Sequence, residues 1–160
     1  MKAHQTLVAY FSATGTTAKA AHSIADITDG TLHEIVPQTT YTHADLDWHD
    51  KQSRSSVEMA DTDARPALKG PATDLTAYDV VFIGYPIWWD EAPRIINTFI
   101  ESNNLKGKML IPFATSGGSS IHNSVKVLKQ TYPDLNWKEG CLLNHAGKAT
   151  IQNWIEKNTR

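Results

Sequence analysis

The first stretch of residues suited to ligand chemistry spans residues 12–17 and reads Ser-Ala-Thr-Gly-Thr-Thr. It lies between an apolar run and a segment of helical period, so its hydroxyls and backbone N–H groups can bind a phosphate at a helix start. The loop has no cation, and the ATP-binding pattern GxxxxGK[ST] and the dinucleotide pattern GxGxxG are both missing from the sequence. We therefore expect a single phosphate group, held by the residues of this loop other than alanine: Ser12, Thr14, Gly15, Thr16 and Thr17. A cluster that only turns the chain and caps a helix is the open alternative.

The second stretch carries two adjacent tryptophans and reads Pro86, Ile87, Trp88 and Trp89. Exposed indoles are uncommon in a loop, because so much apolar surface is normally buried. Either tryptophan alone could belong to the core, but neighbouring side chains point in different directions. We therefore expect one indole to offer a platform on which a planar heteroaromatic ring stacks.

The third stretch is small and polar and consists of Thr115, Ser116, Gly117, Gly118 and Ser119. Such a backbone can approach a ligand closely and donate N–H groups to ring heteroatoms. Together, a phosphate loop, an aromatic platform and a backbone grip describe a site for a mononucleotide with a flat ring. Flavin mononucleotide (FMN) fits this description.

The elements that must position these stretches follow from the hydrophobic pattern. Continuous apolar runs, typical of strands covered on both faces, occupy residues 7–11, 80–85 and 109–114. Shorter or alternating runs that suit edge strands occupy residues 31–36 and 140–143. Segments of helical period lie between and after them, at residues 16–27, 92–102, 119–131 and 148–157. This order predicts a parallel sheet with helices on both faces, and ligands bind outside the carboxyl ends of such strands.

One connection, residues 37–77, is too long for a structureless loop in a compact domain. We expect it to hold a short helix around residues 55–60 and a functional excursion. It also carries Asp45, Asp47, His49 and Asp50, but it lacks the glycine and final glutamate of a calcium loop, which favours a solvated loop over a metal site.

The loop at residues 12–17 resembles the phosphate loop of flavodoxins. Residues 84–89, 92–95 and 112–119 are similar to a bacterial flavodoxin-like subfamily with a long second connection, as are residues 41–48 and 64–68 within that connection. The resemblance covers nearly the whole chain, with two departures: Asp90 stands where relatives often have a small residue such as glycine, and Ser120 and His122 fall in a stretch that is usually richer in glycine.

The resemblance implies one flavodoxin-like domain over residues 1–160. Its fold would be an α/β three-layer sandwich with a five-stranded parallel sheet in the order 2-1-3-4-5. FMN would be bound with its phosphate at residues 12–17, one side of its ring against residues 86–89, and its other edge within residues 115–119. The long connection, with Trp48 and Arg65, would either cover the flavin and form a substrate pocket or contact another subunit, so both a monomer and a homodimer are open.

Composition narrows the function. The chain has 15 Lys and Arg against 17 Asp and Glu, a formal net charge of −2, which argues against a nucleic-acid-coating or membrane-coating protein. Its single cysteine, Cys141, permits no internal disulfide and suits a cytoplasmic location, and no apolar run approaches the roughly 20 residues of a membrane span.

We therefore expect an FMN-binding redox protein that passes electrons to a partner protein or a small acceptor. Electron-carrier flavodoxins are usually markedly acidic, so the near-neutral charge mildly favours the alternative, an NAD(P)H-dependent quinone or flavin reductase. A non-catalytic FMN-binding sensor module is a third, less favoured interpretation.

Overall fold

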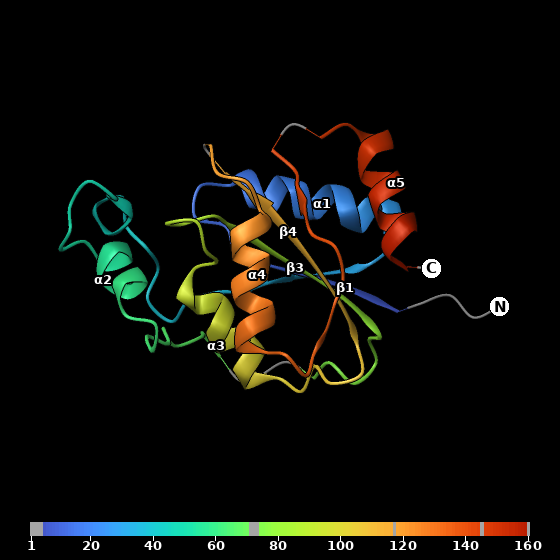
Figure 1. Cartoon of the computed structure of the whole chain (residues 1–160), viewed down its shortest axis with the longest axis horizontal. Coiled ribbons are helices and arrows are strands. Elements are labelled where there is room, and N and C mark those ends of the chain that lie inside the picture. The colour runs from blue at the N-terminus through green and yellow to red at the C-terminus, as the bar shows by residue number, and fades with distance from the viewer. Residues whose placement is uncertain (1–4, 71–73, 117, 145, 160) are drawn as a thin grey trace.

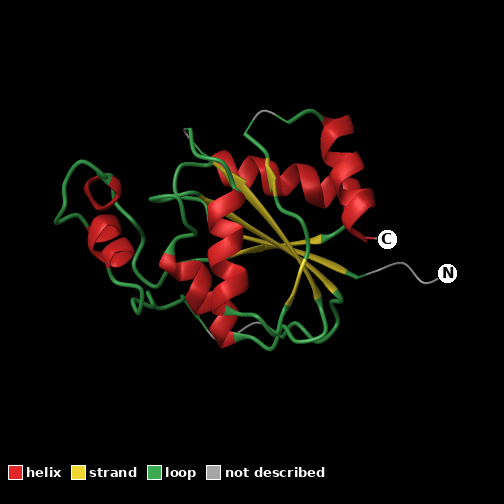
Figure 2. Ribbon diagram, in the orientation of Figure 1, coloured by secondary structure: helices red, strands yellow, loops and turns green. Residues whose placement is uncertain are grey.

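Strands and helices alternate along most of the chain in the computed structural model, which describes residues 5–70, 74–116, 118–144 and 146–159 (Figures 1 and 2). The strands in these residues are β1 (Thr6–Tyr10), β2 (Thr31–Glu34), β3 (Val80–Pro86), β4 (Met109–Thr115), β5 (Asn136–Trp137) and β6 (Cys141–Leu142). The α-helices are α1 (Thr16–Thr28), α2 (Arg54–Ala60), α3 (Arg94–Ser102), α4 (His122–Thr131) and α5 (Lys148–Thr159), with a 3-10 turn, η1, at Ala44–Leu46. Within the described residues, no helix is both long and apolar enough to cross a bilayer.

The sheet has the strand order β2-β1-β3-β4-β5, and each of its strand pairs is parallel, which confirms the predicted flavodoxin-like α/β fold. In the centre of the sheet, Leu7 pairs with Val81 and Val81 pairs with Leu110. Because the strands are parallel and in register, the loops that leave β1, β3 and β4 emerge at the same edge.

Two apolar layers cover the faces of the sheet. One face packs against α3 and α4, where Ile83 and Tyr85 of β3 join a cluster with Ile96 and Phe99. The other face packs against α1 and α5, where Phe82 contacts Trp154 with ring centroids 5.6 Å apart. The alternation of strand side chains between these clusters explains why the central strands are continuously apolar in sequence.

The far edge of the sheet is broken into two short strands, where the sequence predicts one at residues 140–143. β5 pairs with the start of β4 and β6 pairs with its end. Leu110 accepts a hydrogen bond from Lys138 and Ala114 accepts one from Leu143, so both carbonyls face this edge. Pro112 is two residues from both Leu110 and Ala114, so its backbone faces the same edge, but its nitrogen has no hydrogen to donate. The break between β5 and β6 therefore lies opposite the proline.

Two helices begin later than their hydrophobic period predicts. α3 begins at Arg94 rather than at residue 92, because Pro93 is its N-cap with an extended backbone. α4 begins at His122 rather than at residue 119, because Gly118 and Ser119 donate their N–H groups to the Ser116 hydroxyl and form a turn before the helix.

The long second connection contains the predicted short helix, α2, which stands apart from the sheet and the other helices (Figure 1). The side chain of Arg94, only 4% exposed, fixes its carboxyl end. The guanidinium donates to the backbone carbonyls of Met59 at 2.8 Å and Asp61 at 3.2 Å and pairs with Glu91 at 3.1 Å. These bonds satisfy helix-end carbonyls that have no partner within the helix. The connection is therefore anchored to the start of α3.

Candidate functional site

A cleft of about 630 Å³ opens at the carboxyl edge of the sheet. This volume lies within the range of about 300–1,000 Å³ that is usual for small-molecule sites. Its wall combines residues from the loop after β3, the loop after β4 and the long connection: Ile87, Trp88, Trp89, Ser116, Gly118, Ser119, Leu46, Trp48 and Ser55. The structure thus brings together two of the three loops that the sequence predicts to bind a ligand.

The two tryptophans of the β3 loop have different environments. Trp88 is half-buried and packs edge-on against Phe11 and Tyr41, with ring centroids 5.7 and 5.4 Å away. Trp89 is 46% exposed. Trp88 and Glu91 exchange two backbone hydrogen bonds, and the residues between them, Trp89 and Asp90, have φ angles of 48° and 65°. This is the geometry of a type I′ turn, which needs positive φ at both central positions and fixes the direction in which each indole leaves the loop.

The loop at residues 12–17 forms the start of α1 and does not line the cleft. Gly15 is the N-cap residue with φ 96°, a left-handed conformation that suits glycine, and its N–H donates to the Ser12 hydroxyl at 3.0 Å. The N–H groups of the first helical turn have no intrahelical partner, and this turn contains no acidic residue. An anion is therefore favoured at this point of the described chain.

One contact connects the helix start to the β4 strand. The buried hydroxyls of Thr17 and Thr115 lie 2.7 Å apart. Thr14, Gly15 and Thr16 are exposed, whereas Thr17 faces inward. The predicted phosphate-binding residues therefore have two different roles. Thr17 links two loops of the site, whereas the exposed Thr14, Gly15 and Thr16 are the ones that can meet a ligand.

The β4 loop is held by a residue that the sequence analysis missed. The Asn144 side-chain amide donates to the Ser116 carbonyl at 2.6 Å, and its oxygen accepts the Ser116 N–H at 2.7 Å. The Ser116 hydroxyl in turn accepts the N–H groups of Gly118 and Ser119, so these two donors are engaged within the loop. Gly117 lies outside the described residues. The one signal for Asn144 in the sequence is its position, since it is a polar residue just after the short strand β6.

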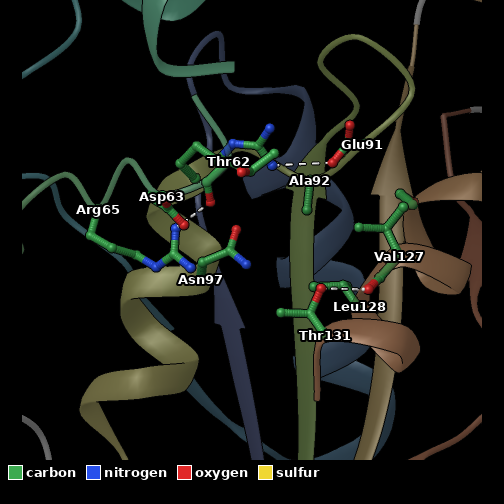
Figure 3. A pocket seen from close by; sticks show the side chains of 11 residues that line it. Thr62, Asp63, Arg65, Glu91, Ala92, Asn97, Val127, Leu128 and Thr131 are labelled. Atoms are coloured by element: carbon green, nitrogen blue, oxygen red, sulfur yellow. Dashed lines mark hydrogen bonds and ion pairs between the residues drawn. The ribbon is translucent and has the colours of Figure 1, made fainter. Parts of the chain in front are cut away.

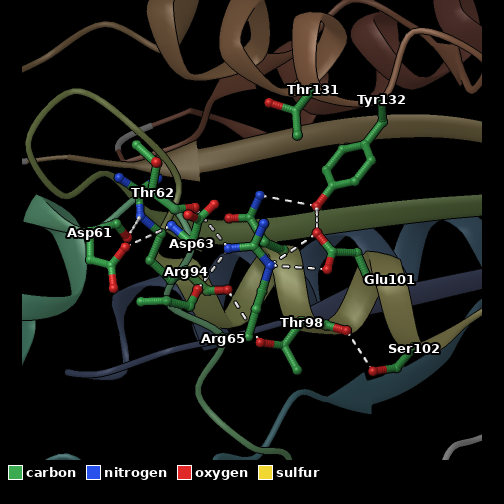
Figure 4. Close-up of polar contacts among 12 residues, drawn as sticks. Asp61, Thr62, Asp63, Arg65, Arg94, Thr98, Glu101, Ser102, Thr131 and Tyr132 are labelled. Atoms are coloured by element: carbon green, nitrogen blue, oxygen red, sulfur yellow. Dashed lines mark hydrogen bonds and ion pairs between the residues drawn. The ribbon is translucent and has the colours of Figure 1, made fainter.

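The long connection supplies the wall that faces the two loops. Trp48 is 65% exposed, lines the cleft together with Leu46, and stacks on His49 with ring centroids 3.7 Å apart. Arg65, which belongs to the same connection, lies elsewhere and pairs with Glu101 at 3.0 Å (Figure 4). Of these two residues of the connection, only Trp48 lines the cleft.

Tyr41 connects this wall to the β3 loop. Its ring contacts Trp88 and is covered by the Arg54 guanidinium 3.7 Å from its centroid, and its hydroxyl donates to Glu58. Burial, together with the bond to the Glu58 carboxylate, raises the pKa of Tyr41 well above its ordinary value. Tyr41 is therefore a neutral donor at physiological pH and a fixed contact between α2 and the site.

A second cavity of about 260 Å³ lies beside α3 and α4 and contains none of the predicted site residues (Figure 3). Three of the charged groups at its wall are paired: Arg94 with Glu91, and Arg65 with Glu101. No group of three or more potential metal ligands occurs among the described residues. Asp45, Asp47 and Asp50 instead each accept a nearby backbone N–H. The cleft at the sheet edge is therefore the better candidate for a cofactor site.

The residues at the sheet edge fit a phosphate ester that carries a flat ring. The start of α1 offers unpaired N–H groups and exposed hydroxyls to an anion, and the cleft offers indole surfaces and small polar groups to a ring. The family model described as Flavodoxin matches residues 5–158. The protein belongs to the flavodoxin family.

The chain is also similar to solved structures of flavoproteins. The chain is 60% identical to a provisionally assigned flavoprotein from Bacteroides eggerthii, with 98% of this chain and 99% of that chain covered and a TM-score of 0.95. A similar protein from Bacteroides uniformis is 59% identical, with coverages of 97% and 99% and a TM-score of 0.93. A Lactobacillus acidophilus flavoprotein, solved in complex with FMN, is 21% identical and shares the fold, with coverages of 99% and 100% and a TM-score of 0.74. No curated protein matches the chain.

Proposed function

We propose that this flavodoxin-family protein binds FMN at the carboxyl edge of its sheet and transfers electrons through it. The observation that carries the proposal is the convergence of the β3 and β4 loops on one indole-lined cleft. The phosphate-type loop at the start of α1 is connected to the β4 strand by the bond between Thr17 and Thr115. The phosphate and the ring of a flavin mononucleotide thus each have a chemically matched partner at one edge of the sheet.

In this proposal, each loop has a distinct task. The exposed Thr14, Gly15 and Thr16 bind the phosphate with hydroxyls and the first N–H groups of α1. Trp89 gives its exposed indole to the ring, and the β4 loop, held by Asn144, meets the polar edge of the ring. Bound FMN would supply the one- and two-electron chemistry, and the surrounding residues would set its orientation and its potential.

A second candidate function is the NAD(P)H-dependent reduction of a quinone or a free flavin. The observation that favours it is the wall contributed by the long connection, because Leu46, Trp48 and Ser55 turn an open sheet edge into a cleft. A carrier that docks on another protein needs no such wall. The net charge of −2 supports the same choice, because carriers use strong charge to orient docking.

Two measurements test these functions in order. Purified protein should show flavin absorbance or take up added FMN, and a colourless protein that takes up none would overturn the proposal. Stopped-flow mixing of the oxidised, FMN-loaded protein with NADH or NADPH then separates the two candidates. Rapid bleaching by either nucleotide supports a reductase, whereas no bleaching supports a carrier that is reduced by a partner protein.

A further inference from the structure

The cavity of about 260 Å³ beside α3 and α4 has a polar side and an apolar side. Figure 3 shows Asp63 and Asn97 on one side and Val127 and Leu128 on the other. None of the residues assigned to FMN is among the described residues that line it. Its volume lies just below the usual range for small-molecule sites, so it suits a ligand much smaller than a nucleotide.

Asn97 presents an unpartnered acceptor to this cavity. The residue is only 6% exposed, and its Nδ2 donates to the Tyr132 hydroxyl at 3.1 Å. That hydroxyl gives its single proton to the Glu101 carboxylate, which can only accept, so the orientation of the Asn97 amide is fixed (Figure 4). The amide oxygen therefore faces away from Tyr132 and accepts no hydrogen bond from the described residues.

The same oxygen is accessible from the cavity. Among the described residues, no fully buried side-chain nitrogen or oxygen lacks a hydrogen-bond partner. The unpartnered oxygen of Asn97 must therefore retain accessible surface, and the residue lines the cavity. A polar atom in so buried a side chain normally has a partner, so this oxygen points to a bound donor.

Asp63 adds a carboxylate on the same side. Within the described part of the chain it forms no ion pair, and its carboxylate accepts no hydrogen bond. Its charge acts on Arg65, but the Nε of that guanidinium donates to both carboxylate oxygens of Glu101 at 3.0 Å, and its Nη1 donates to the Thr62 carbonyl at 2.9 Å. The carboxylate of Asp63 is therefore left for a cation from outside the chain.

Most donors of the wall are already used. All three guanidinium nitrogens of Arg94 donate to protein oxygens. The hydroxyl of Ser124 donates to the Ile121 carbonyl at 2.8 Å, and that of Thr131 donates to the Val127 carbonyl at 2.8 Å. Because the remaining groups are mainly acceptors, a ligand has to supply the protons. A primary ammonium has three donors and no acceptor, and its bond to a carboxylate is charge-assisted.

From these features we propose that the cavity binds a small organic cation, a primary ammonium carried by a short apolar chain. The ammonium would donate to Asp63 and to the Asn97 oxygen, and the chain would pack against Ala92, Val127 and Leu128. This second site is separate from the cleft at the sheet edge, and the inference does not depend on the proposed FMN function.

The test compares three probes with the same five-carbon chain at pH 7: pentylamine, which is then protonated, neutral pentan-1-ol and anionic pentanoate. Titration of the ¹⁵N-labelled full chain, followed by nuclear magnetic resonance, should give a Kd for the amine about ten-fold lower than for the alcohol. Pentanoate should bind no more tightly than the alcohol. The amine should shift the side-chain amide signal of Asn97 and leave the indole N–H signals of Trp48 and Trp89 unchanged.

Asp63→Asn should reduce the preference for the amine over the alcohol to about three-fold or less. The fold should tolerate this change, because Asp63 is exposed and only its backbone N–H makes a hydrogen bond, to Asp61. Asp26→Asn is the matched control, since it removes one exposed carboxylate from α1, on the other face of the sheet, and should leave the preference at about ten-fold.

Four results would overturn the inference. They are equal binding of amine and alcohol, tighter binding of pentanoate, no binding of any probe, and shifts confined to the two indoles, which would place the amine in the cleft. An unchanged preference in Asp63→Asn, or an equal loss in Asp26→Asn, would overturn it as well, because the ammonium would then not be held by Asp63.

Discussion

The indole of Trp88 packs edge-on against the phenol ring of Tyr41, with ring centroids 5.4 Å apart and an angle of 74° between the planes. Trp88 follows β3 at the candidate site, whereas Tyr41 belongs to the long connection between β2 and α2. Phe11, just after β1, packs edge-on against both rings. This three-ring contact makes the connection a structural part of the site rather than an appended loop.

The contact predicts that Tyr41→Ala weakens both the fold and the site. The variant loses two aromatic contacts and the Arg54 contact of a half-buried ring, so we expect the free energy of unfolding to fall by about 2 kcal/mol in urea denaturation. FMN affinity should fall several-fold because Trp88 loses its support. Tyr41→Phe keeps the ring and removes only the bond to Glu58, at a cost of about 1 kcal/mol. Equal losses in the two variants would show that the ring contacts do not matter.

A second prediction concerns Arg94, which is 4% exposed and holds the end of α2. Arg94→Met removes the donor to the Met59 carbonyl and the ion-pair partner of Glu91, so unfolding should become easier by about 3 kcal/mol. The variant should also be cleaved faster by protease within residues 38–69. Arg65→Met is the matched control, because its ion pair with Glu101 is partly exposed and should contribute less than about 1 kcal/mol. Similar losses in both variants would contradict the anchoring role of Arg94.

Asp90 should influence the potential of bound FMN through its charge. Asp90 directly follows the cleft residue Trp89 in the turn after β3, and its negative charge there disfavours a reduced flavin that carries negative charge. Asp90→Gly and Asp90→Asn should therefore both raise the two-electron potential, by about 20 mV for each 1 kcal/mol of repulsion removed. Asparagine also tolerates the left-handed φ of 65° at this position, so it separates charge from backbone strain. If redox titration shows no rise in the two-electron potential of Asp90→Asn, the charge of Asp90 does not influence the potential.

Alkaline stability provides a test of the contacts between α3 and α4. Burial and the bond to the Glu101 carboxylate raise the pKa of Tyr132 to about 12 from its ordinary 10.0. Because the folded-state pKa is the higher one, this stabilisation is complete below pH 10 and is lost as the pH rises through 12. For a half-exposed phenol we expect about 1 kcal/mol. The difference in unfolding free energy between the unaltered protein and Tyr132→Phe should shrink by that amount between pH 9 and 12; a constant difference would contradict the assignment.

Much of the fold could be predicted because the central strands are buried on both faces. Val81 and Phe82 lie on opposite faces of β3, each within an apolar cluster, and this leaves an unbroken apolar run in the sequence. The edge was less predictable. Its interruption depends on Pro112 of the neighbouring strand, and a missing N–H in one strand is not visible in the composition of the next.

The same contrast holds for the site. Loops that directly follow strands were found from their residue types, because parallel strands bring their carboxyl ends to one edge. The sequence did not reveal four residues that line or support the cleft, because each depends on how a distant segment folds back: Leu46, Ser55, Tyr41 and Asn144. Trp48 was noticed for its residue type alone, and only the structure separates it from Arg65.

The central claim, that three strand-end loops form an FMN site, is tested most directly by titrating the apoprotein with FMN and, in parallel, with riboflavin, which lacks the phosphate. Quenching of flavin fluorescence should show one FMN bound per chain and binding of riboflavin at least about ten-fold weaker, because the start of α1 then has no anion to hold. Equal affinities for the two flavins, or no binding of either, would contradict the assignment.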